Sequence, residues 1–298
     1  MLQNTSKGIL AMLVAVAAFA VMDATMKQLA ASYPPLEVSC LRGLASIPFF
    51  LLGVTFTRQW RGLLPVSWIA HLIRGGLAIF MLWSFIYAVR QLPLSSAYGI
   101  FLCAPLLITA LSALVLREQV GWHRWLAIAC GLLGVGIILN PDSKDMITFA
   151  GFAAFGSALC YAVAALMIQR LARTDSTLSI ALSFIVIVAV GTGIGALPHW
   201  KPFQSAHWPW VLALGASGAV GQYLIIYAFR RAPASVIAPF EYTALLWGIS
   251  LDWILWSTVP SARMLSGAGV VIASGLYLIY REHRVSREVR RPLPDSGV

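Results

Sequence analysis

Four ionisable side chains lie within long apolar stretches of this sequence, and they are its first candidates for chemistry. They are Asp23, Arg42, Arg74 and Glu241. A charged side chain at the centre of a bilayer costs about 2.5–3.5 kcal/mol on insertion scales, so each one needs a partner or a task. Counting about 1.5 Å per helical residue brings Asp23 and Arg42 to one depth, and Arg74 and Glu241 to another. The sequence therefore predicts two candidate ion pairs, which either hold helices together or handle a charged solute or a proton.

Glu241 is the most informative of these residues because it follows Pro239 by two positions. Proline lacks an N–H group, so a kink there frees a backbone carbonyl beside the carboxylate. A carboxylate in such a place can bind a substrate amine or carry a proton. We expect Asp252 to lie near a helix end in a solvated or structural role, and His71 to lie nearer an interface.

Aromatic side chains form a second candidate site. Phe80, Trp83 and Tyr87 fall on one face of a helix, and Tyr227 repeats Tyr87 later in the chain. Tyrosine and tryptophan combine a flat apolar surface with a polar group, which suits a cavity for a ring or an apolar side chain. The alternative is packing or an aromatic belt at the membrane interface, which is favoured for Tyr87 and Tyr227. The candidate substrate-binding aromatics are Trp83, Tyr98, Tyr161, Tyr223 and Tyr242.

The elements that carry these residues are apolar runs of about 20 residues. Of the 298 residues, 59% are hydrophobic and 11% are charged, against about 25% charged in a soluble domain. Lipid offers no partners to backbone polar groups, so the runs should be helices. We expect an all-α membrane protein with ten transmembrane helices, at residues 7–30, 34–57, 67–89, 93–116, 121–140, 147–171, 176–198, 207–229, 233–256 and 261–281.

The ten spans divide into two similar halves. The segment from Tyr87 to Ser95 matches the segment from Tyr227 to Ser235 at five of nine positions, with an offset of 140. A unit of five spans enters the membrane in the opposite direction the second time, so the repeats should be inverted. We assign 1–6 to the N-terminus, 7–140 to the first repeat, 147–281 to the second, and 282–298 to a basic tail, which we expect to be disordered.

The net charge of +10 is distributed as a topology signal. In the ten-span layout most lysines and arginines fall on the side that holds both termini, so these should be cytoplasmic and the membrane a bacterial inner membrane. We expect the bilayer, and no nucleic acid, as the partner of this charge. The apolar run after Lys7 leads directly into further spans, so we interpret it as a retained helix rather than a signal peptide.

Small residues mark the last helix of each half. They are Gly131, Gly134 and Gly136 in the first, and Gly267, Gly269 and Gly275 in the second. Small residues let membrane helices approach closely, either within one chain or across a homodimer. The four cysteines lie inside proposed helices without a CxxC spacing, so we predict no disulfide, no metal site and no cofactor.

Several local patterns together resemble the EamA family of the drug/metabolite transporter superfamily. They are Pro34-Pro35 followed by Arg42-Gly43-Leu44-Ala45, Pro105 followed by Arg117-Glu118, and Tyr242-Thr243-Ala244-Leu245-Leu246-Trp247. The resemblance implies two inverted five-helix repeats and a carrier that binds its substrate between them by alternating access. One departure is that Thr258 stands where the second half of the family commonly repeats the acidic residue Glu118, which leaves a symmetric role for that glutamate open.

The resemblance implies transport, and within the family the chain is similar to amino-acid exporters of the YddG type. We therefore expect a secondary active or facilitative exporter of small organic metabolites, with aromatic and other neutral amino acids preferred. An uptake carrier for a flavin, a nucleoside-like compound or S-adenosylmethionine is the alternative. The sequence holds no HExxH, GxSxG or Walker A motif. Short loops without a polar cluster disfavour a membrane-embedded lipid-modifying enzyme, and the doubled inverted unit disfavours a receptor without flux.

Overall fold

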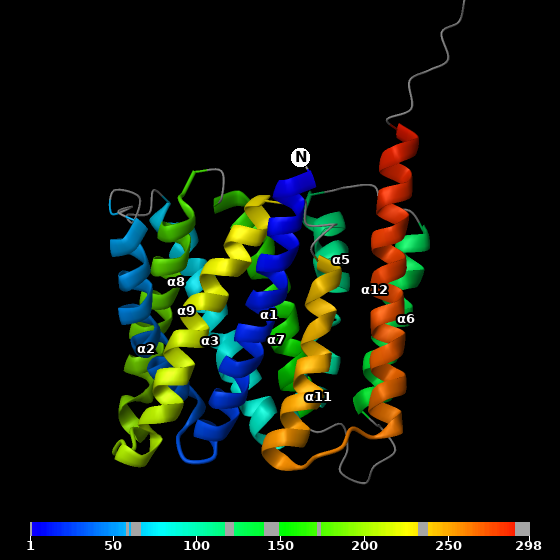
Figure 1. The fold of residues 1–298 in the computed structure, drawn as a ribbon. Coiled ribbons are helices and arrows are strands. Elements are labelled where there is room, and N and C mark those ends of the chain that lie inside the picture. The colour runs from blue at the N-terminus through cyan, green and yellow to red at the C-terminus, as the bar shows by residue number, and fades with distance from the viewer. Residues whose placement is uncertain are drawn as a thin grey trace, which may run out of the picture.

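The computed structural model describes residues 2–57, 60, 67–116, 122–139, 149–171, 174–231 and 238–289 (Figure 1). Helices fill these ranges, and no β-strand occurs within them. The α-helices are α1 (Leu2–Ala30), α2 (Pro35–Thr57), α3 (Trp68–Gln91), α4 (Leu94–Phe101), α5 (Ala104–Leu116), α6 (Trp122–Leu139), α7 (Phe149–Leu171), α8 (Thr177–Ala196), α9 (Trp208–Arg231), α11 (Thr243–Trp256) and α12 (Ala262–Val289). Short 3-10 helices are η2 (Leu197–His199), η3 (Ser205–His207) and η4 (Ala238–Tyr242).

The helices form ten spans in the described part of the chain. Helices α4 and α5 together make the fourth span, and η4 with α11 makes the ninth. Among the described residues, six segments are long and apolar enough to cross a membrane by themselves, and the other spans have shorter apolar stretches there. The all-α, ten-helix membrane architecture expected from the sequence is confirmed. The six segments are Ser6–Ala30, Pro35–Phe56, Trp68–Gln91, Phe149–Ile168, Thr177–His199 and Ser205–Ala228.

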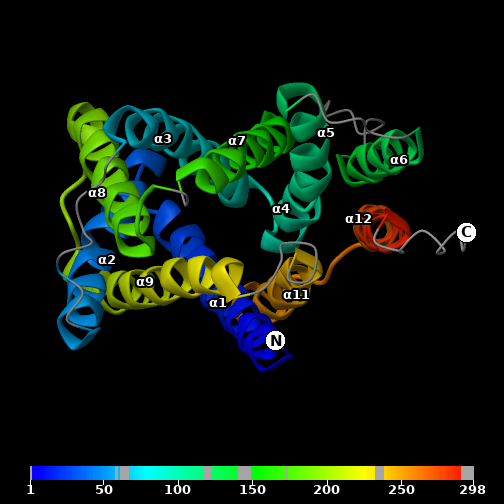
Figure 2. The ribbon, with the colours of Figure 1, turned by 90° about the horizontal axis from the view of Figure 1, so that it is seen from above.

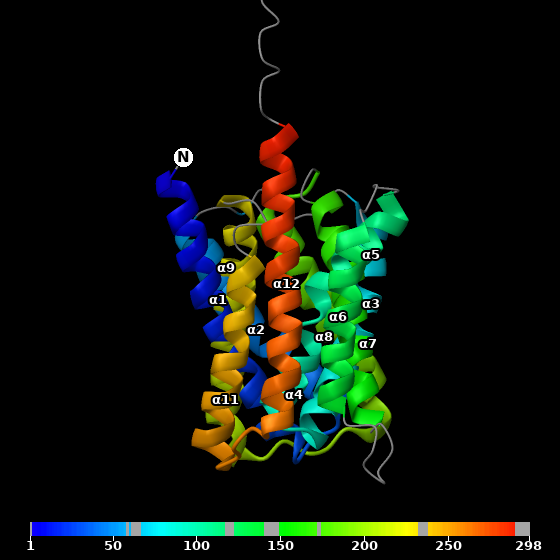
Figure 3. The same ribbon diagram turned by 90° about the vertical axis from the view of Figure 1, so that its right-hand side faces the viewer.

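The two five-span units are inverted relative to each other. Helix α1 runs away from the end of the molecule that holds the N-terminus, whereas α7, which opens the second unit, runs toward it (Figures 1 and 3). Contacts between the units come in matching sets. The packing of α1 on α9 is repeated by α7 on α3, and that of α2 on α9 by α8 on α3. The two units are therefore interlocked rather than laid side by side.

The last helices of the units, α6 and α12, pack on each other at one edge of the molecule (Figure 2). A Cβ atom placed on Gly267 would lie 2.7 Å from the carbonyl oxygen of Gly134. A Cβ atom placed on Gly134 would lie 2.8 Å from the carbonyl oxygen of Gly267. The glycines thus bring two backbones together within one chain. The homodimer stays a prediction.

Gly267→Val should destabilise the protein by about 1–3 kcal/mol, because the added atoms meet backbone that has no room to move. Gly269→Val is the matched control, since a Cβ on Gly269 meets nothing within 4 Å. Reversible unfolding in mixed micelles measures both. Equal stability of the two variants would contradict this account of the α6–α12 contact.

The fourth span, expected at 93–116, is broken into two helices. Helix α4 ends at Phe101 and α5 begins at Ala104. The cause is Pro105, which has no N–H to donate to the carbonyl of Phe101. The chain crosses the gap with short turns, in which Cys103 N donates to Ile100 O at 3.2 Å and Leu106 N donates to Cys103 O at 3.0 Å.

The ninth span changes helix type at the matching place. Its 3-10 helix η4 ends at Tyr242, which is Leu102 plus the repeat offset of 140. The kink expected at Pro239 thus takes the form of a 3-10 turn. The irregular backbone of the two units thus falls at equivalent positions of their fourth spans. Pro233, Arg117 and Glu118 lie outside the described residues.

The basic tail begins as a helix, so the disorder expected for residues 282–298 is wrong for the first part of that range. Helix α12 continues to Val289 and projects beyond the other helices (Figures 1 and 3). Opposite charges four residues apart, as at Arg284 and Glu288, support such an extension of a stable helix. Residues 290–298 lie outside the described part of the chain.

Candidate functional site

A cavity of about 120 Å³ lies where the two broken spans meet α1, α7 and α9. Four of the residues predicted as site residues line it together: Asp23, Tyr98, Tyr161 and Glu241. Apolar and aromatic side chains complete the wall. They are Val16, Phe19, Phe101, Leu102, Ala104, Pro105, Ile225 and Ala244. The cavity therefore combines two carboxylates with a largely apolar lining that includes four aromatic rings.

Asp23 is held in the cavity wall by a tyrosine. The hydroxyl of Tyr98 donates to Asp23 Oδ2 at 2.7 Å. Behind this pair the ring of Phe85 from α3 stacks on Tyr98, with centroids 6.2 Å apart, and meets Phe101 edge-on at 5.6 Å. Gly248 of α11 leaves room for the Tyr98 ring, since a Cβ there would lie 2.7 Å from its Cδ2. The carboxylate and the aromatic wall are therefore fixed by packing from both repeats.

Glu241 enters the cavity from η4 and makes no hydrogen bond or ion pair with any residue in the described ranges. At the repeat offset of 140 its counterpart is Phe101, which lines the same cavity. Ionisable groups inside membrane proteins are costly, and those without a protein partner are functional candidates. The irregular part of the fourth helix thus places an aromatic ring, Phe101, at the cavity in the first repeat, and a carboxylate, Glu241, in the second.

Three predicted aromatics lie elsewhere. Trp83 stacks between Phe80 and Tyr87 along α3, with centroid distances of 5.9 and 6.1 Å. Tyr223 stacks on Tyr227 on the matching face of α9 and is 38% exposed. These rows fit the alternative of an aromatic face on the bundle surface. Tyr242 turns its hydroxyl toward α12, where a Cβ on Gly275 would collide with it.

The two ion pairs suggested by helix depth are not formed. Asp23 bonds to Tyr98, while Arg42 Nε lies 3.1 Å from the sulfur of Met22. Arg74 Nη1 donates to Ile180 O at 3.1 Å, on the far side of the bundle from α11. Both guanidinium groups lie over the ring of Phe184, at 5.7 Å for Arg42 and 4.8 Å for Arg74. Cation–π contact with an aromatic ring of α8 therefore replaces the expected carboxylates.

A charged cluster joins the repeats at the end of the molecule opposite the N-terminus. Asp252 of α11 is buried and accepts from Lys27 Nζ at 3.2 Å. Its Oδ1 also accepts from Leu94 N at 3.0 Å, and its Oδ2 from Ser95 N at 2.7 Å. Lys27 lies 4.4 Å over the ring of Trp256. Asp252 thus satisfies the free N–H groups that begin α4, where a negative charge is also favoured by the helix dipole.

Asp252→Ala should lower the free energy of unfolding by about 3 kcal/mol, since it leaves two buried N–H groups without an acceptor. Lys27→Met should cost about 1 kcal/mol, because its partner keeps both backbone donors. Unfolding in mixed micelles separates the two. A Lys27 variant that is as unstable as the Asp252 variant would show that the ion pair, and not the helix cap, dominates.

Inverted repeats whose interrupted helices enclose a cavity with buried carboxylates define a class of protein, the membrane transporters. Residues 6–140 and 148–281 both match the model of the EamA-like transporter family. The chain belongs to this family.

Curated relatives of the chain are named as transporters. A riboflavin transporter of Vibrio cholerae is 28% identical over 293 residues, covering 95% of this chain and 96% of the relative. The pseudopaline exporter CntI of Pseudomonas aeruginosa is 26% identical over 280 residues, covering 91% and 95%. An S-adenosylmethionine uptake transporter of Rickettsia prowazekii is 24% identical over 214 residues, covering 72% of each chain. The finer resemblance to exporters of the YddG type stays a prediction.

Proposed function

We propose that this transporter exports small organic metabolites that carry a positively charged amine, neutral and aromatic amino acids foremost, across the bacterial inner membrane by alternating access. The observation that supports this is the cavity shared by Asp23 and Glu241, with aromatic rings around them. Two carboxylates in an apolar enclosure favour a cation, and one of them has no partner among the described residues. An ammonium group supplies the missing charge and hydrogen bonds.

The rest of an amino acid also finds complementary chemistry in this cavity. Its apolar or aromatic side chain can pack against Phe19, Phe101 and Tyr161. Its carboxylate can face the N-terminal end of α5, which begins at Ala104 in the cavity wall. The positive end of a half-helix is a common partner for anionic substrate groups in carriers with broken helices.

Alternating access requires that one end of the bundle closes while the other opens. In this structure the Lys27–Asp252 cluster ties α1, α4 and α11 together at one end. With both termini cytoplasmic, as the arginine distribution favours, that end faces the periplasm. Release to the outside would then require the cluster to separate, with the interruptions at Leu102 and Tyr242 as places where the spans can bend.

Uptake of a larger metabolite is the second candidate, favoured by the riboflavin transporter that matches nearly the full length of the chain. The cavity volume bears on this choice. Its 120 Å³ is below the 300–1,000 Å³ typical of pockets for drug-sized ligands. A flavin would therefore need a larger rearrangement of the helices than an amino acid.

Glu241→Gln should reduce amino-acid flux by about tenfold or more, because a charge-assisted hydrogen bond to the substrate amine is lost. The measurement is efflux of labelled amino acids from proteoliposomes, with riboflavin and S-adenosylmethionine as competing substrates. Tyr223→Phe is the control, since Tyr223 lies outside the cavity.

Two outcomes would change the proposal. No flux of any amino acid above empty vesicles, together with saturable riboflavin flux, would favour the second candidate. Unchanged flux in Glu241→Gln would remove the carboxylate from substrate binding.

A further inference from the structure

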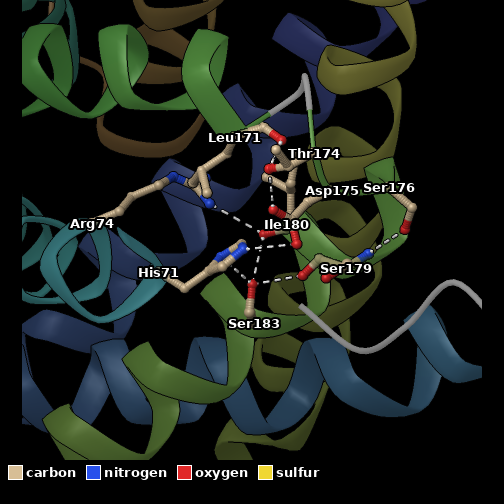
Figure 4. Close-up of polar contacts among 9 residues, drawn as sticks. All are labelled: His71, Arg74, Leu171, Thr174, Asp175, Ser176, Ser179, Ile180 and Ser183. Carbon is tan, nitrogen blue, oxygen red and sulfur yellow. Dashed lines mark hydrogen bonds and ion pairs between the residues drawn. The ribbon is translucent and has the colours of Figure 1, made fainter. Parts of the chain in front are cut away.

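A buried polar cluster joins α3 to the beginning of α8, away from the central cavity (Figure 4). His71 of α3 is 2% exposed, Asp175 of the turn before α8 is 5% exposed, and Ser183 of α8 is 8% exposed. His71 Nδ1 lies 2.8 Å from Ser183 Oγ, and His71 Nε2 lies 3.5 Å from Asp175 Oδ1. The imidazole is therefore placed between a hydroxyl and a carboxyl group.

The hydroxyl fixes one of the imidazole protons. Ser183 Oγ lies 2.6 Å from the carbonyl oxygen of Ser179, a distance that requires the serine proton between them. A hydroxyl has a single proton to donate. Ser183 must therefore accept from His71, so Nδ1 carries a hydrogen.

The carboxyl group then determines the state of the other nitrogen. A neutral imidazole with its hydrogen on Nδ1 would point the lone pair of Nε2 at Asp175 Oδ1. Two electron-rich atoms facing each other in a buried site repel, because little solvent screens them. A proton on the pair removes the repulsion, either as imidazolium with carboxylate or as imidazole with a protonated acid. Thr174 Oγ1 donates to Asp175 Oδ2 at 2.8 Å and helps to orient the carboxyl group.

The charged surroundings allow this proton to leave. Arg74 follows His71 by three residues on α3, which places it on the same helix face, and it donates to Ile180 O beside the cluster. The guanidinium group of Arg42, from α2, lies over the Phe184 ring, which Arg74 also contacts. These fixed positive charges oppose an additional buried cation. The side chain of Arg170 and all of Arg173, which precede the turn, lie outside the described residues.

We propose that His71 and Asp175 form a proton-binding site that couples transport to a proton gradient; this inference depends on the proposed function. Helix α3 provides the connection. Phe85 lies about 21 Å along α3 from His71, and it packs on Tyr98 and Phe101 of the cavity wall. Loss of the proton places Nε2 against the carboxylate and pushes α3 away from the α7–α8 turn. A shift of α3 moves the aromatic wall that holds Asp23.

The first test measures the proton without any transport. In protein labelled with ¹⁵N-histidine, the resonances of His71 are identified among five histidines by their loss in His71→Gln. Over the pH range in which the protein stays folded, we expect Nδ1 to keep its hydrogen and the Nε2 signal to report gain and loss of a proton. A lone pair on Nδ1, or an Nε2 signal that does not change over the range, would overturn the assignment.

The second test measures coupling. In proteoliposomes with a proton gradient, His71→Gln and Asp175→Asn should each reduce accumulation of substrate about tenfold. Movement of protons in the direction opposite to the substrate, followed by an internal pH dye, should fall with it. His207→Gln is the matched control, because His207 bonds to Tyr33 and Tyr33 lies at the opposite end of the bundle.

The possible results are distinguishable. Accumulation by both variants at the wild-type level would overturn the coupling site. Absence of flux in the wild-type protein would contradict the proposed function, while the histidine spectra would still decide whether the pair binds a proton.

Discussion

The shortage of hydrogen-bond partners in lipid is the constraint on which this structure depends. Every backbone N–H and C=O inside a bilayer must find a partner in the protein, so the spans are helices. An interruption is tolerated only where protein surrounds it. Both interruptions, at Leu102–Cys103 and at η4, lie in the interior, and both border the same cavity. The constraint therefore brings irregular backbone, Glu241, which has no partner among the described residues, and the Asp23–Tyr98 pair to one place.

The same constraint explains how buried charges are treated elsewhere in the bundle. Asp252 is matched by two backbone donors and a lysine, Arg74 by a carbonyl and an aromatic ring, and Arg42 by a sulfur atom and the same ring. Few of these partners are charges of opposite sign. Backbone dipoles and aromatic faces are available at many positions of a helical bundle, whereas a second ionised side chain adds its own desolvation cost.

These partners show why the sequence predicted the scaffold better than the site. Apolar run lengths gave the span boundaries, because each run is a local property of the chain. The ion pairs Asp23–Arg42 and Arg74–Glu241 were predicted from depth alone, and depth does not say which helices are neighbours. Tyr98 and Tyr161 line the cavity, while Trp83 and Tyr223 lie outside it, since the rotation of each helix about its axis depends on contacts between the repeats. One feature of the sequence pointed to the start of α4. Pro93 is a residue that commonly begins a helix, and the first N–H groups of a helix need acceptors such as the carboxylate of Asp252.

The charged residues of the Lys27–Asp252 cluster are not repeated in the sequence of the other half. Asp252 corresponds to Ser112 at the offset of 140, and Lys27 corresponds to Gln169 at an offset of 142, which relates the first helices of the two halves. Two identical inverted repeats would give inward- and outward-facing states of equal energy, because each state would be the other turned over. Under the proposed alternating access, a polar contact at the Lys27–Asp252 end would favour the state in which that end is closed. The difference between Asp252 and Ser112, and between Lys27 and Gln169, would then decide which of the two states the empty protein favours.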